Sequence, residues 1–324
     1  MFRYLKNVCR QRGGVCSHAL NDFRFLNGFV TLTFMKNEPS LWIENFPSPQ
    51  ANDHKYNRGQ VAVLGGVDMT GAACLSAESA ARIGAGVVTI ISPHLTVFQR
   101  MKILDPLLVY RAFKPYIIAR NDISMNDFVK KAKLKGCVCP VIGPGLGDKE
   151  YSVARSIVLS VLDQGVPIVL DADGLNAFEG HQGSLWAHTH ENVVLTPHDG
   201  EFKKLFPGVL KEDRAVAAIE AAKISNSIIV LKGANSIIAA PDGEAVVNNN
   251  ALPYLATAGS GDVLSGMIAG LVSQGMPAFE AACAAVWIHG RASEIIGCGL
   301  VASDIIEIIP KILKEILGIR EKLG

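Results

Sequence analysis

The sequence has little net charge, few charged side chains and no long apolar run, and each absence excludes a class of protein. Lys and Arg (31) almost balance Asp and Glu (30), whereas a dedicated nucleic-acid-binding protein usually carries a basic excess. No stretch approaches the roughly 18–20 uninterrupted apolar residues of a membrane-spanning helix. With 49% hydrophobic and 19% charged residues, the 324-residue chain can bury a large core, which excludes disorder.

Paired cysteines and two common nucleotide-binding motifs are also absent. The seven cysteines are scattered over the chain, which is typical of a protein in a reducing compartment rather than of a disulfide framework. No segment matches the phosphate-binding pattern G-x-x-x-x-G-K-[ST]. The glycines at 65–71 do not follow G-x-G-x-x-G, which argues against a hydride-transferring dehydrogenase. These observations predict a soluble, cytoplasmic, enzyme-sized protein without a dinucleotide fingerprint.

The first 37 residues differ from the rest of the chain. They hold six Arg or Lys and a single acid, Asp22, with no clear periodicity. One interpretation is an organelle transit segment, because such segments are rich in Arg and poor in acids. The interpretation we favour is a poorly ordered N-terminal extension, or the remnant of an upstream domain. Residues 38–324 are then expected to form one domain, whose core begins at Gln60.

From residue 60 onward, apolar runs of strand length alternate with helical stretches. Near-continuous Val, Ile and Leu strands separated by helices predict a mostly parallel sheet that is covered on both faces. The expected fold class is therefore α/β, a three-layer α/β/α sandwich. Strands are predicted at 61–64, 87–91, 138–142, 167–170, 193–195 and 228–231, with a hairpin at 236–247, and helices at 71–83, 151–162, 211–226, 262–273, 277–296 and 303–317.

Glycine and polar residues follow five of the predicted strands. Because ligands of open parallel sheets bind beyond the carboxyl ends of the strands, these segments are expected to line one cleft. Any one of them is a weak signal, but the set is strong. The segments are Gly-Gly-Val-Asp-Met-Thr-Gly-Ala (65–72), Gly-Pro-Gly-Leu-Gly (143–147), Asp-Ala-Asp-Gly-Leu-Asn (171–176), Thr-Pro-His-Asp-Gly-Glu (196–201) and Lys-Gly-Ala-Asn-Ser (232–236).

The sharpest feature is the segment Ala-Thr-Ala-Gly-Ser-Gly-Asp (256–262), which precedes an apolar helix. Gly259 and Gly261 allow a tight turn that exposes successive N–H groups, and the helix start adds its positive dipole end. This combination predicts a site for a phosphate or a developing anion. Asp262 is either an ordinary stabilising residue of the first helical turn or a general base beside the anion site. The spacing alone leaves both interpretations open.

These segments together resemble one branch of the ribokinase-like superfamily, the carbohydrate-kinase-like NAD(P)H-hydrate dehydratases. The matching segments run in the family's order over about residues 54–297. The combination of Thr-Pro-His-x-Gly-Glu, Lys-Gly-Ala and Gly-Ser-Gly-Asp is specific to this branch. The matches are Gly-Ala (71–72), Gly-Pro-Gly-Leu-Gly (143–147), Leu-Asp-Ala-Asp (170–173), Leu-Thr-Pro-His-Asp-Gly-Glu-Phe (195–202), Val-Leu-Lys-Gly-Ala (230–234) and residues 255–266.

The resemblance implies an activity and a set of site residues. Family members remove the water that nicotinamide ring C6 gains in hydrated NADH and NADPH, and they use a nucleotide to do so. The resemblance assigns nucleotide binding to Lys232, Gly233, Ala234, Asn235, Ser236 and Gly261, and contact with the hydrated dinucleotide to Ala72, Gly143, Gly145, His198 and Asp262.

In the mechanism that this resemblance implies, Asp262 accepts the proton of the C6 hydroxyl while a phosphoryl group is transferred to its oxygen. The backbone N–H groups of Gly259, Ser260 and Gly261 hold the phosphoryl oxygens. Phosphate then leaves and the dihydronicotinamide is restored. The expected co-substrate is ADP, giving AMP and phosphate, with ATP as the alternative. Mg²⁺ is expected with the nucleotide, and no residue is assigned as a metal ligand of the protein.

Several polar residues also have a plainer interpretation. His198 could hydrogen-bond only the backbone of its own turn. Asp171 and Asp173 could bind Mg²⁺, but we expect them to cap the following short helix. Glu201 is expected at the start of a helix, and His289, within an apolar helix, in packing or a subunit contact.

The sequence departs from the family pattern before the Gly-Ser-Gly-Asp loop. Relatives commonly carry a Gly-Asn pair there, whereas residues 248–254 read Asn-Asn-Asn-Ala-Leu-Pro-Tyr, so the contact made by that pair is not carried over. Many relatives also have an upstream epimerase domain of about 200 residues. In this sequence the matching segments begin at about residue 54, which leaves too few residues before them for such a domain. Epimerisation of the substrate is therefore expected to be spontaneous or the work of a separate protein.

Two rival functions remain. A ribokinase-superfamily kinase acting on a vitamin precursor or sugar alcohol would use the same anion loop, although the Thr-Pro-His and Lys-Gly-Ala segments favour the dehydratase. A nucleotide-binding sensor without turnover would have no need of Asp262. The partners expected are small molecules rather than nucleic acid or membrane, and the family resemblance implies a homotetramer.

Overall fold

The computed structural model describes residues 25–26, 29–30, 34–92, 114, 116–120, 122–147, 151–210 and 213–323. The chain divides into two compact units, Met1–Met35 and Lys36–Gly324. In the first unit, strands β1 (Phe25–Leu26) and β2 (Phe29–Val30) pair antiparallel. Most of the N-terminal extension predicted at 1–37 lies outside the described residues, so its expected disorder stays a prediction.

The second unit is built on a sheet of ten described strands. Seven neighbouring strands of this sheet, from β10 to β6 in spatial order, run parallel. The hairpin of β11 and β12 joins antiparallel to this parallel part, as the sequence predicts. In spatial order the strands are β3 (Met35–Lys36), β12 (Ala245–Asn248), β11 (Ser236–Ala239), β10 (Ile228–Leu231), β9 (Val193–Leu195), β8 (Ile168–Leu170), β7 (Val138–Ile142), β4 (Gln60–Leu64), β5 (Val87–Ile91) and β6 (Ile117–Arg120).

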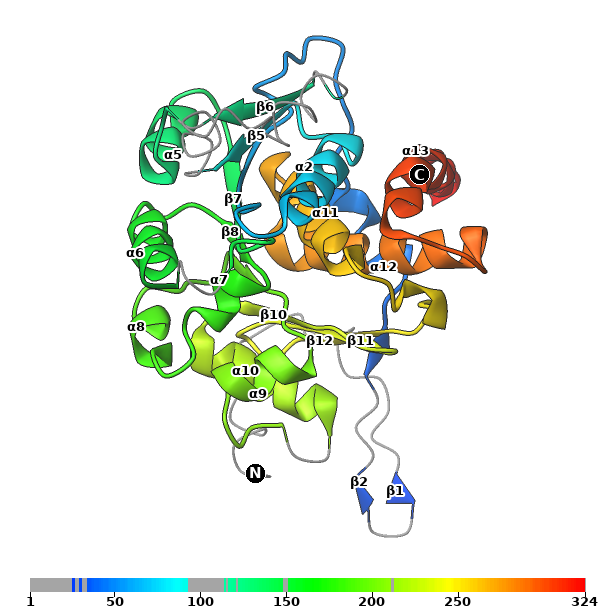
Figure 1. Ribbon diagram of the computed structural model, residues 1–324. Helices are drawn as coiled ribbons and strands as arrows, with labels where there is room; N and C mark the ends of the chain where they lie inside the picture. The colour runs from blue at the N-terminus through cyan, green and yellow to red at the C-terminus, as the bar shows by residue number, and fades with distance from the viewer. Residues whose placement is uncertain are drawn as a thin grey trace, which may run out of the picture. The chain divides into compact units, whose positions relative to one another are not determined.

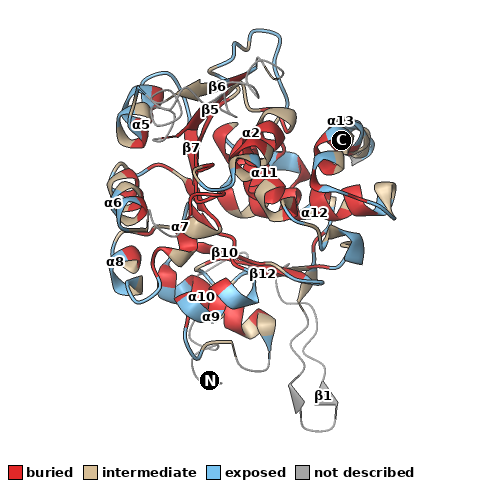
Figure 2. Ribbon diagram, viewed as in Figure 1, coloured by how far each residue is buried: buried red, intermediate tan, exposed pale blue. Residues whose placement is uncertain are grey.

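Helices cover both faces of the sheet, which gives the predicted three layers (Figure 1). Every residue of β4 and β7 is buried, as expected for strands that lack a solvent face (Figure 2). One face carries α2 (Thr70–Arg82), α11 (Ser260–Ser273), α12 (Ala278–Ile296) and α13 (Ala302–Leu323), and the other carries α5 (Met125–Lys133), α6 (Tyr151–Leu162), α7 (Asp173–Asn176), α8 (Gln182–Trp186), α9 (Asp199–Leu205) and α10 (Arg214–Ser225).

Strand β4 lies at the point where the order of the sheet reverses. Its neighbour on one side is β5, the next strand in the chain, and its neighbour on the other side is β7. Chain connections leave these two sides toward opposite faces, which is the arrangement in which a ligand-binding crevice is expected beyond the carboxyl ends of β4 and β7. The loops that follow these two strands are two of the five segments that the sequence predicts to line the cleft.

Some elements differ from the predictions for local physical reasons. Helix α10 starts at Arg214 rather than at 211, because the Asp213 side chain accepts hydrogen bonds from the first free backbone N–H groups. Helix α11 begins at Ser260, two residues earlier than predicted, because Gly259 adopts a φ of +88° and turns the chain into the helix. Strand β6 and helix α5 were missed, since both are short and largely polar on one side.

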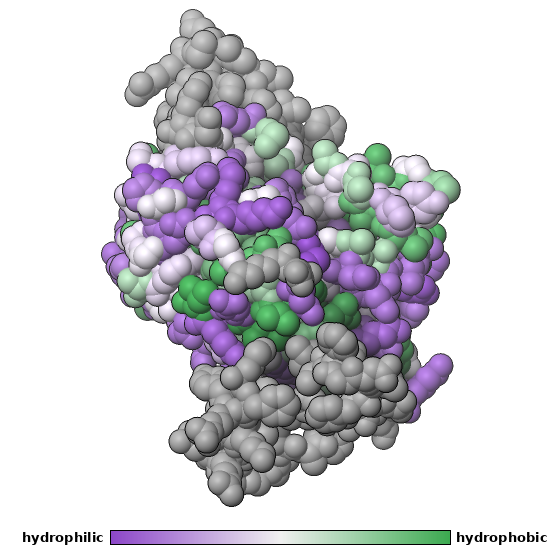
Figure 3. Space-filling view, turned by 90° about the horizontal axis from the view of Figure 1, so that it is seen from below, coloured by the Kyte–Doolittle hydropathy of each residue, from purple (hydrophilic) through white to green (hydrophobic). Residues whose placement is uncertain are grey.

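In the view of Figure 3, hydrophobic side chains gather in the middle of the described face, with hydrophilic side chains around them. Within the part of the chain that is described, no helix combines the length and apolarity that crossing a membrane requires.

Candidate active site

The loops after β4 and β7 interlock through their backbones. The Gly66 N–H donates to the carbonyl oxygen of Pro144 at 2.9 Å, and the Asp68 N–H donates to that of Gly145 at 3.0 Å. The backbones can approach this closely because a Cβ at Gly65 would lie only 2.0 Å from the Pro144 carbonyl oxygen. The crevice therefore has a floor of backbone atoms.

Ala72, Gly143 and Gly145, which the sequence predicts to contact the dinucleotide, lie on this floor. A Cβ at Gly145 would come within 2.2 Å of the Met69 carbonyl oxygen and 3.1 Å of the Ala72 side chain. A Cβ at Gly143 would lie 1.8 Å from the carbonyl oxygen of Asp171. The structure thus brings the three predicted residues to one place, and it joins that place to the end of β8.

Lys232 lies at the centre of a group of acidic side chains beyond β8, β9 and β10. Its Nζ donates to Oδ1 of Asp171 at 2.8 Å and is 3.8 Å from Oε2 of Glu201. The Asp171 and Glu201 side chains are almost fully buried, and that of Lys232 is 20% exposed. Burial opposes a charge on Lys232, but the carboxylates of Asp171 and Glu201 outweigh it and raise the pKa of Lys232. Lys232 is therefore a fixed cation at neutral pH.

Glu201 and His198 lock the turn between β9 and α9. The Nδ1 atom of His198 accepts hydrogen bonds from the Gly200 N–H at 2.9 Å and the Glu201 N–H at 3.3 Å. In return, Oε2 of Glu201 accepts from the His198 N–H at 2.9 Å, which completes a capping box. Burial raises the pKa of Glu201, while Lys232 acts in the opposite direction.

The backbone hydrogen bonds of His198 use only one of its two ring nitrogens. Because Nδ1 accepts backbone N–H groups, the proton of a neutral ring lies on Nε2. The side chain is 60% exposed, and Nε2 lies 3.6 Å from Oε1 of Glu201. His198 thus hydrogen-bonds the backbone of its own turn, which is the plainer of its two interpretations. Its predicted contact with the dinucleotide stays a prediction.

The glycine loop before α11 is held from two sides. A Cβ at Gly259 would lie 2.5 Å from Cδ1 of Leu75 and 3.1 Å from the side chain of Ala302, so glycine is required there on steric as well as conformational grounds. Below the loop, Nε2 of the buried His289 lies 3.0 Å from the Ser260 carbonyl oxygen. Burial lowers the pKa of His289 to about 4, so its ring is neutral and serves as a hydrogen-bond donor. His289 is thus packed inside the protein, as expected, and its hydrogen bond supports the predicted anion loop.

Asp262 has the most perturbed carboxyl group of this region. Burial raises its pKa from 3.8 to about 7, with a further contribution in the same direction from Asp171, whereas Lys232 acts against the shift. A carboxyl group that titrates near neutral pH can accept a proton from a hydroxyl and release it again. Of the two interpretations of Asp262 that the sequence leaves open, this environment favours the general base.

The nucleotide segment predicted at 232–236 forms the turn between β10 and β11. Gly233, Ala234 and Asn235 are exposed, whereas Ser236 is buried and its hydroxyl accepts from the Gly233 N–H at 3.3 Å. Arg214, which the sequence analysis did not single out, donates to the Lys232 carbonyl oxygen at 3.0 Å and pairs with Asp199. In the sequence, only its position directly after the helix cap Asp213 could have drawn attention to Arg214.

Asp171 and Asp173 do not cap α7, so that expectation was wrong. The cap residue of this helix is Ala172, which has a φ of +46° and makes no side-chain cap bond. Asp171 binds Lys232 instead, and the Asp173 carboxylate accepts from the Gly147 N–H at 2.8 Å and from the Tyr151 hydroxyl at 3.2 Å. The strained backbone at Ala172 turns both carboxylates toward neighbouring loops rather than toward their own helix.

Two of the asparagines at 248–250, where the sequence departs from its relatives, join a hydrogen-bond network: Asn248 is buried and Asn250 half-buried, whereas Asn249 is exposed. Asn37 donates to Oδ1 of Asn248 at 3.0 Å, Asn248 donates to Asn250 at 2.7 Å, and Asn250 donates to the Trp287 carbonyl oxygen at 3.0 Å. These bonds fix the chain that leads to the glycine loop. The departure thus has a structural role in this protein.

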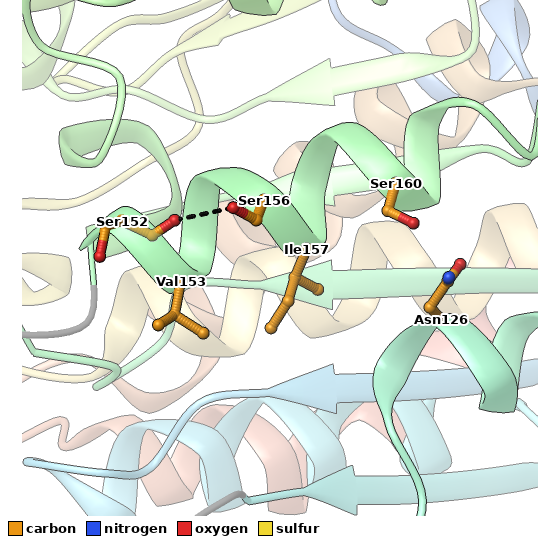
Figure 4. Close-up of a pocket in the computed structure, with 6 residues that line it drawn as sticks. All are labelled: Asn126, Ser152, Val153, Ser156, Ile157 and Ser160. Carbon is orange, nitrogen blue, oxygen red and sulfur yellow. Dashed lines mark hydrogen bonds between the residues drawn. The ribbon is translucent and has the colours of Figure 1, made fainter.

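A concave surface lies away from this site, between α5 and α6 (Figure 4). It is lined by Asn126, Ser152, Val153, Ser156, Ile157 and Ser160. The hydroxyl of Ser156 is used within its helix, where it donates to the Ser152 carbonyl oxygen at 3.2 Å. With neither charged lining residues nor convergent polar groups, this groove gives no reason to place the chemistry there.

Comparison with known proteins identifies similar enzymes. The chain is 34% identical over 272 residues to the ADP-dependent (S)-NAD(P)H-hydrate dehydratase of Neisseria meningitidis, covering 80% of this chain and 86% of that one. It is also 34% identical over 284 residues to a bifunctional NAD(P)H-hydrate repair enzyme of Salinibacter ruber, covering 84% of this chain and 51% of the relative. The chain thus spans about half the length of the bifunctional relatives.

Solved structures confirm the ribokinase-like fold. A ribokinase-like superfamily protein of Enterococcus faecalis matches with a TM-score of 0.74 and 25% identity, covering 91% of this chain and 99% of that one. The ADP/ATP-dependent NAD(P)H-hydrate dehydratase of Bacillus subtilis, co-crystallised with ATP and Mg²⁺, matches with a TM-score of 0.69 and 27% identity, covering 88% of this chain and all of that one. The family model for NAD(P)H-hydrate dehydratase matches residues 61–311, and the chain therefore belongs to that family.

Proposed function

We propose that this protein dehydrates the S epimer of hydrated NADH and NADPH, using ADP and releasing AMP and phosphate. The observation that carries the proposal is Asp262, a carboxyl group with a pKa of about 7 at the start of α11, beside the glycine loop and the Lys232 cation. Membership of the family and the names of the relatives from N. meningitidis and B. subtilis support this choice of substrate and co-substrate.

The two halves of the crevice suit two ligands. The backbone floor at Ala72, Gly143 and Gly145 admits the hydrated dinucleotide at close range, with the Nε2–H of His198 at its rim. The turn from Lys232 to Ser236 and the N–H of Gly261 take the nucleotide. The loop at 259–261 then lies where the two ligands meet, at the positive end of the α11 dipole.

The chemistry follows from the poor leaving ability of a hydroxyl group. Asp262 takes the proton of the C6 hydroxyl, and the hydroxyl oxygen accepts the terminal phosphoryl group of the nucleotide. The N–H groups of Gly259, Ser260 and Gly261 stabilise the charge on the phosphoryl oxygens. Phosphate departs with the electrons of the C6–O bond, assisted by the lone pair of the ring nitrogen, and loss of a proton from C5 restores the dihydronicotinamide.

Mg²⁺ fits this reaction only as a companion of the nucleotide. Among the described residues, no three His, Cys, Asp or Glu side chains are placed to hold a metal ion. Asp171 and Glu201 are engaged by Lys232, and Asp173 by Gly147 and Tyr151. Mg²⁺ commonly keeps its waters and binds through substrate phosphates. No side chain of the described residues is therefore proposed as a ligand of Mg²⁺.

We also propose that the protein is a cytoplasmic homotetramer. The hydrophobic area in Figure 3 suits a subunit contact of the expected homotetramer. The scattered cysteines suit the cytoplasm. A separate epimerase would supply the S epimer from the R epimer.

The test is to follow absorbance at 340 nm after mixing the protein with hydrated NADH, Mg²⁺ and either ADP or ATP. A rise that depends on one nucleotide, with one phosphate released per NADH, establishes the dehydratase and identifies the phosphoryl donor. Absence of a rise with either nucleotide, from protein that binds nucleotide, contradicts the proposal. That result would favour the rival function, a small-molecule kinase acting on the hydroxyl of a vitamin precursor or sugar alcohol.

A further inference from the structure

Asp171 is more deeply buried than Glu201, the other carboxylate beside Lys232. The Asp171 side chain is 2% exposed, and its backbone N–H donates to the Ile142 carbonyl oxygen at 3.2 Å. Its Oδ1 accepts the N–H of the strained residue Ala172 at 2.9 Å as well as the Lys232 ammonium. Gly143 packs closely on the Asp171 carbonyl oxygen. Contacts with three other residues therefore hold Asp171 independently of Lys232.

Lys232 is by contrast a long, flexible side chain whose Nζ needs an anchor. The anchored Nζ lies against the glycine loop, 3.5 Å from the position that a Cβ at Gly261 would take. Asp262 is the next residue along the chain. The ammonium is thereby placed at the start of α11, although Lys232 itself comes from the opposite side of the crevice.

The charges of this region do not balance. The groups that face Asp262 from other elements are Asp171 and Asp173 beyond β8, Glu201 on α9 and Lys232 beyond β10, while the neutral His289 on α12 holds the Ser260 carbonyl oxygen. Lys232 is the only cation among these described groups. With several carboxylates nearby, an Asp262 without this cation would hold its proton more tightly and could not act as a base at neutral pH.

We propose that Asp171 is a positioning residue that fixes the Lys232 ammonium beside Asp262, and that this fixed cation keeps the Asp262 carboxylate able to accept a proton at neutral pH. The inference rests on the proposed function for its catalytic meaning, because it assumes that Asp262 is the base. The arrangement of charges can nevertheless be tested without turnover.

The experiment is a ¹³C NMR titration of the full chain labelled at its Asp carboxyl carbons, with the Asp262 signal identified by its loss in Asp262→Asn. We expect Lys232→Met to raise the pKa of Asp262 by about one unit or more, a tenfold tighter hold on the proton. Lys130→Met, which removes an exposed lysine on α5, is the matched control and leaves the titration unchanged. An unchanged Asp262 titration in Lys232→Met overturns the proposal.

A double-mutant cycle tests the positioning role. Asp171→Asn removes a negative charge near Asp262, which by itself lowers the pKa of Asp262. In the wild-type background it also releases Lys232, which acts in the opposite direction. We therefore expect Asp171→Asn to lower the pKa less in the wild type than in the Lys232→Met background. Equal shifts in the two backgrounds overturn the role of Asp171, because a merely structural residue leaves the shifts independent.

Two further measurements keep the outcomes distinct. Lys232→Gln, which removes the charge but keeps a donor for Asp171, replaces Lys232→Met if that variant does not fold, and Lys232→Arg should titrate close to the wild type. In the pH profile of kcat, the acid limb moves with the NMR value. The expected NMR result in a protein without dehydratase activity defeats the proposed function and leaves this inference standing. If the protein has dehydratase activity but the pKa of Asp262 is the same with and without Lys232, the proposed function stands and this inference is overturned.

Discussion

The two halves of the crevice use opposite means to bring chemistry to one place. Beyond β4 and β7, glycines let backbones approach one another, and the surface offered to a ligand consists of peptide groups. Beyond β8, β9 and β10, buried ionisable side chains hold one another, and the surface offered consists of charges. The glycine half depends on shape and the charged half on electrostatics. Substitutions in the glycine half should therefore lower stability, whereas substitutions in the charged half should lower turnover.

The contrast shows that one sheet edge can separate recognition from reaction. The floor at Ala72, Gly143 and Gly145 offers peptide groups rather than ionisable side chains, so we expect its binding function to depend little on pH. The charged half contains a carboxyl group that titrates near neutral pH, which couples its function to the proton concentration. Gly143, packed on the Asp171 carbonyl oxygen, is where the two halves meet.

The largest expected effect lies in the charged half. Asp262→Asn should lower kcat by about 10²–10⁴, the usual range for a lost general base, because the amide cannot accept the hydroxyl proton. Binding of ADP or ATP, measured by calorimetry, should persist, since the glycine loop and Lys232 are unchanged. A variant that turns over at the wild-type rate would remove Asp262 from the mechanism.

The next effect belongs to the glycine half and is one of stability. Gly143→Ala should lower the free energy of unfolding by at least about 3 kcal/mol, because the new Cβ adds a clash with backbone to a strained φ. Gly165→Ala is the matched control, since Gly165 has a φ of +63° but open space around it, and should cost about 1 kcal/mol. Urea denaturation measures both, and similar values for the two variants would disprove the close approach.

A smaller effect concerns the pH dependence of activity. Asp262 must be ionised to accept a proton, and its pKa of about 7 lies above the ordinary value of 3.8. We therefore expect kcat to fall about tenfold per pH unit below about pH 7 and to level off above it. Steady-state rates from pH 5.5 to 9 check this, and a plateau that extends down to pH 5 would contradict the raised pKa.

The smallest effect separates the two roles of His198. His198→Ala should cost about 1 kcal/mol of stability, because α9 loses its N-terminal cap. His198→Asn restores that cap, since Asn is a preferred capping residue, but lacks the ring nitrogen Nε2. If the ring also contacts the dinucleotide, both variants raise the KM for hydrated NADH by about tenfold, the worth of one hydrogen bond. A normal KM in His198→Asn would assign His198 to capping alone.

Much of the fold could be predicted because its strands are continuous apolar runs and its turns are rich in glycine. Strands β4, β5, β7 and β10 lie within a residue of their predicted positions. The short, partly polar elements β6 and α5 escaped, because their patterns are too weak to separate from loops. The glycines and motif residues that the sequence predicts for the site lie at this edge of the sheet, and their roles stay predictions. Arg214, with no motif around it, was not singled out.

By itself, the sequence determined the order of strands and helices, the glycines at the strand ends and the family, since periodicity and motifs are local properties of the chain. Only the tertiary structure decided that Asp171 binds Lys232 rather than capping a helix, that His289 supports the anion loop, and that the pKa of Asp262 lies near 7. These three results depend on burial and on charges from residues far apart in the chain. Electrostatic interactions of that kind arise only when folding brings the groups together.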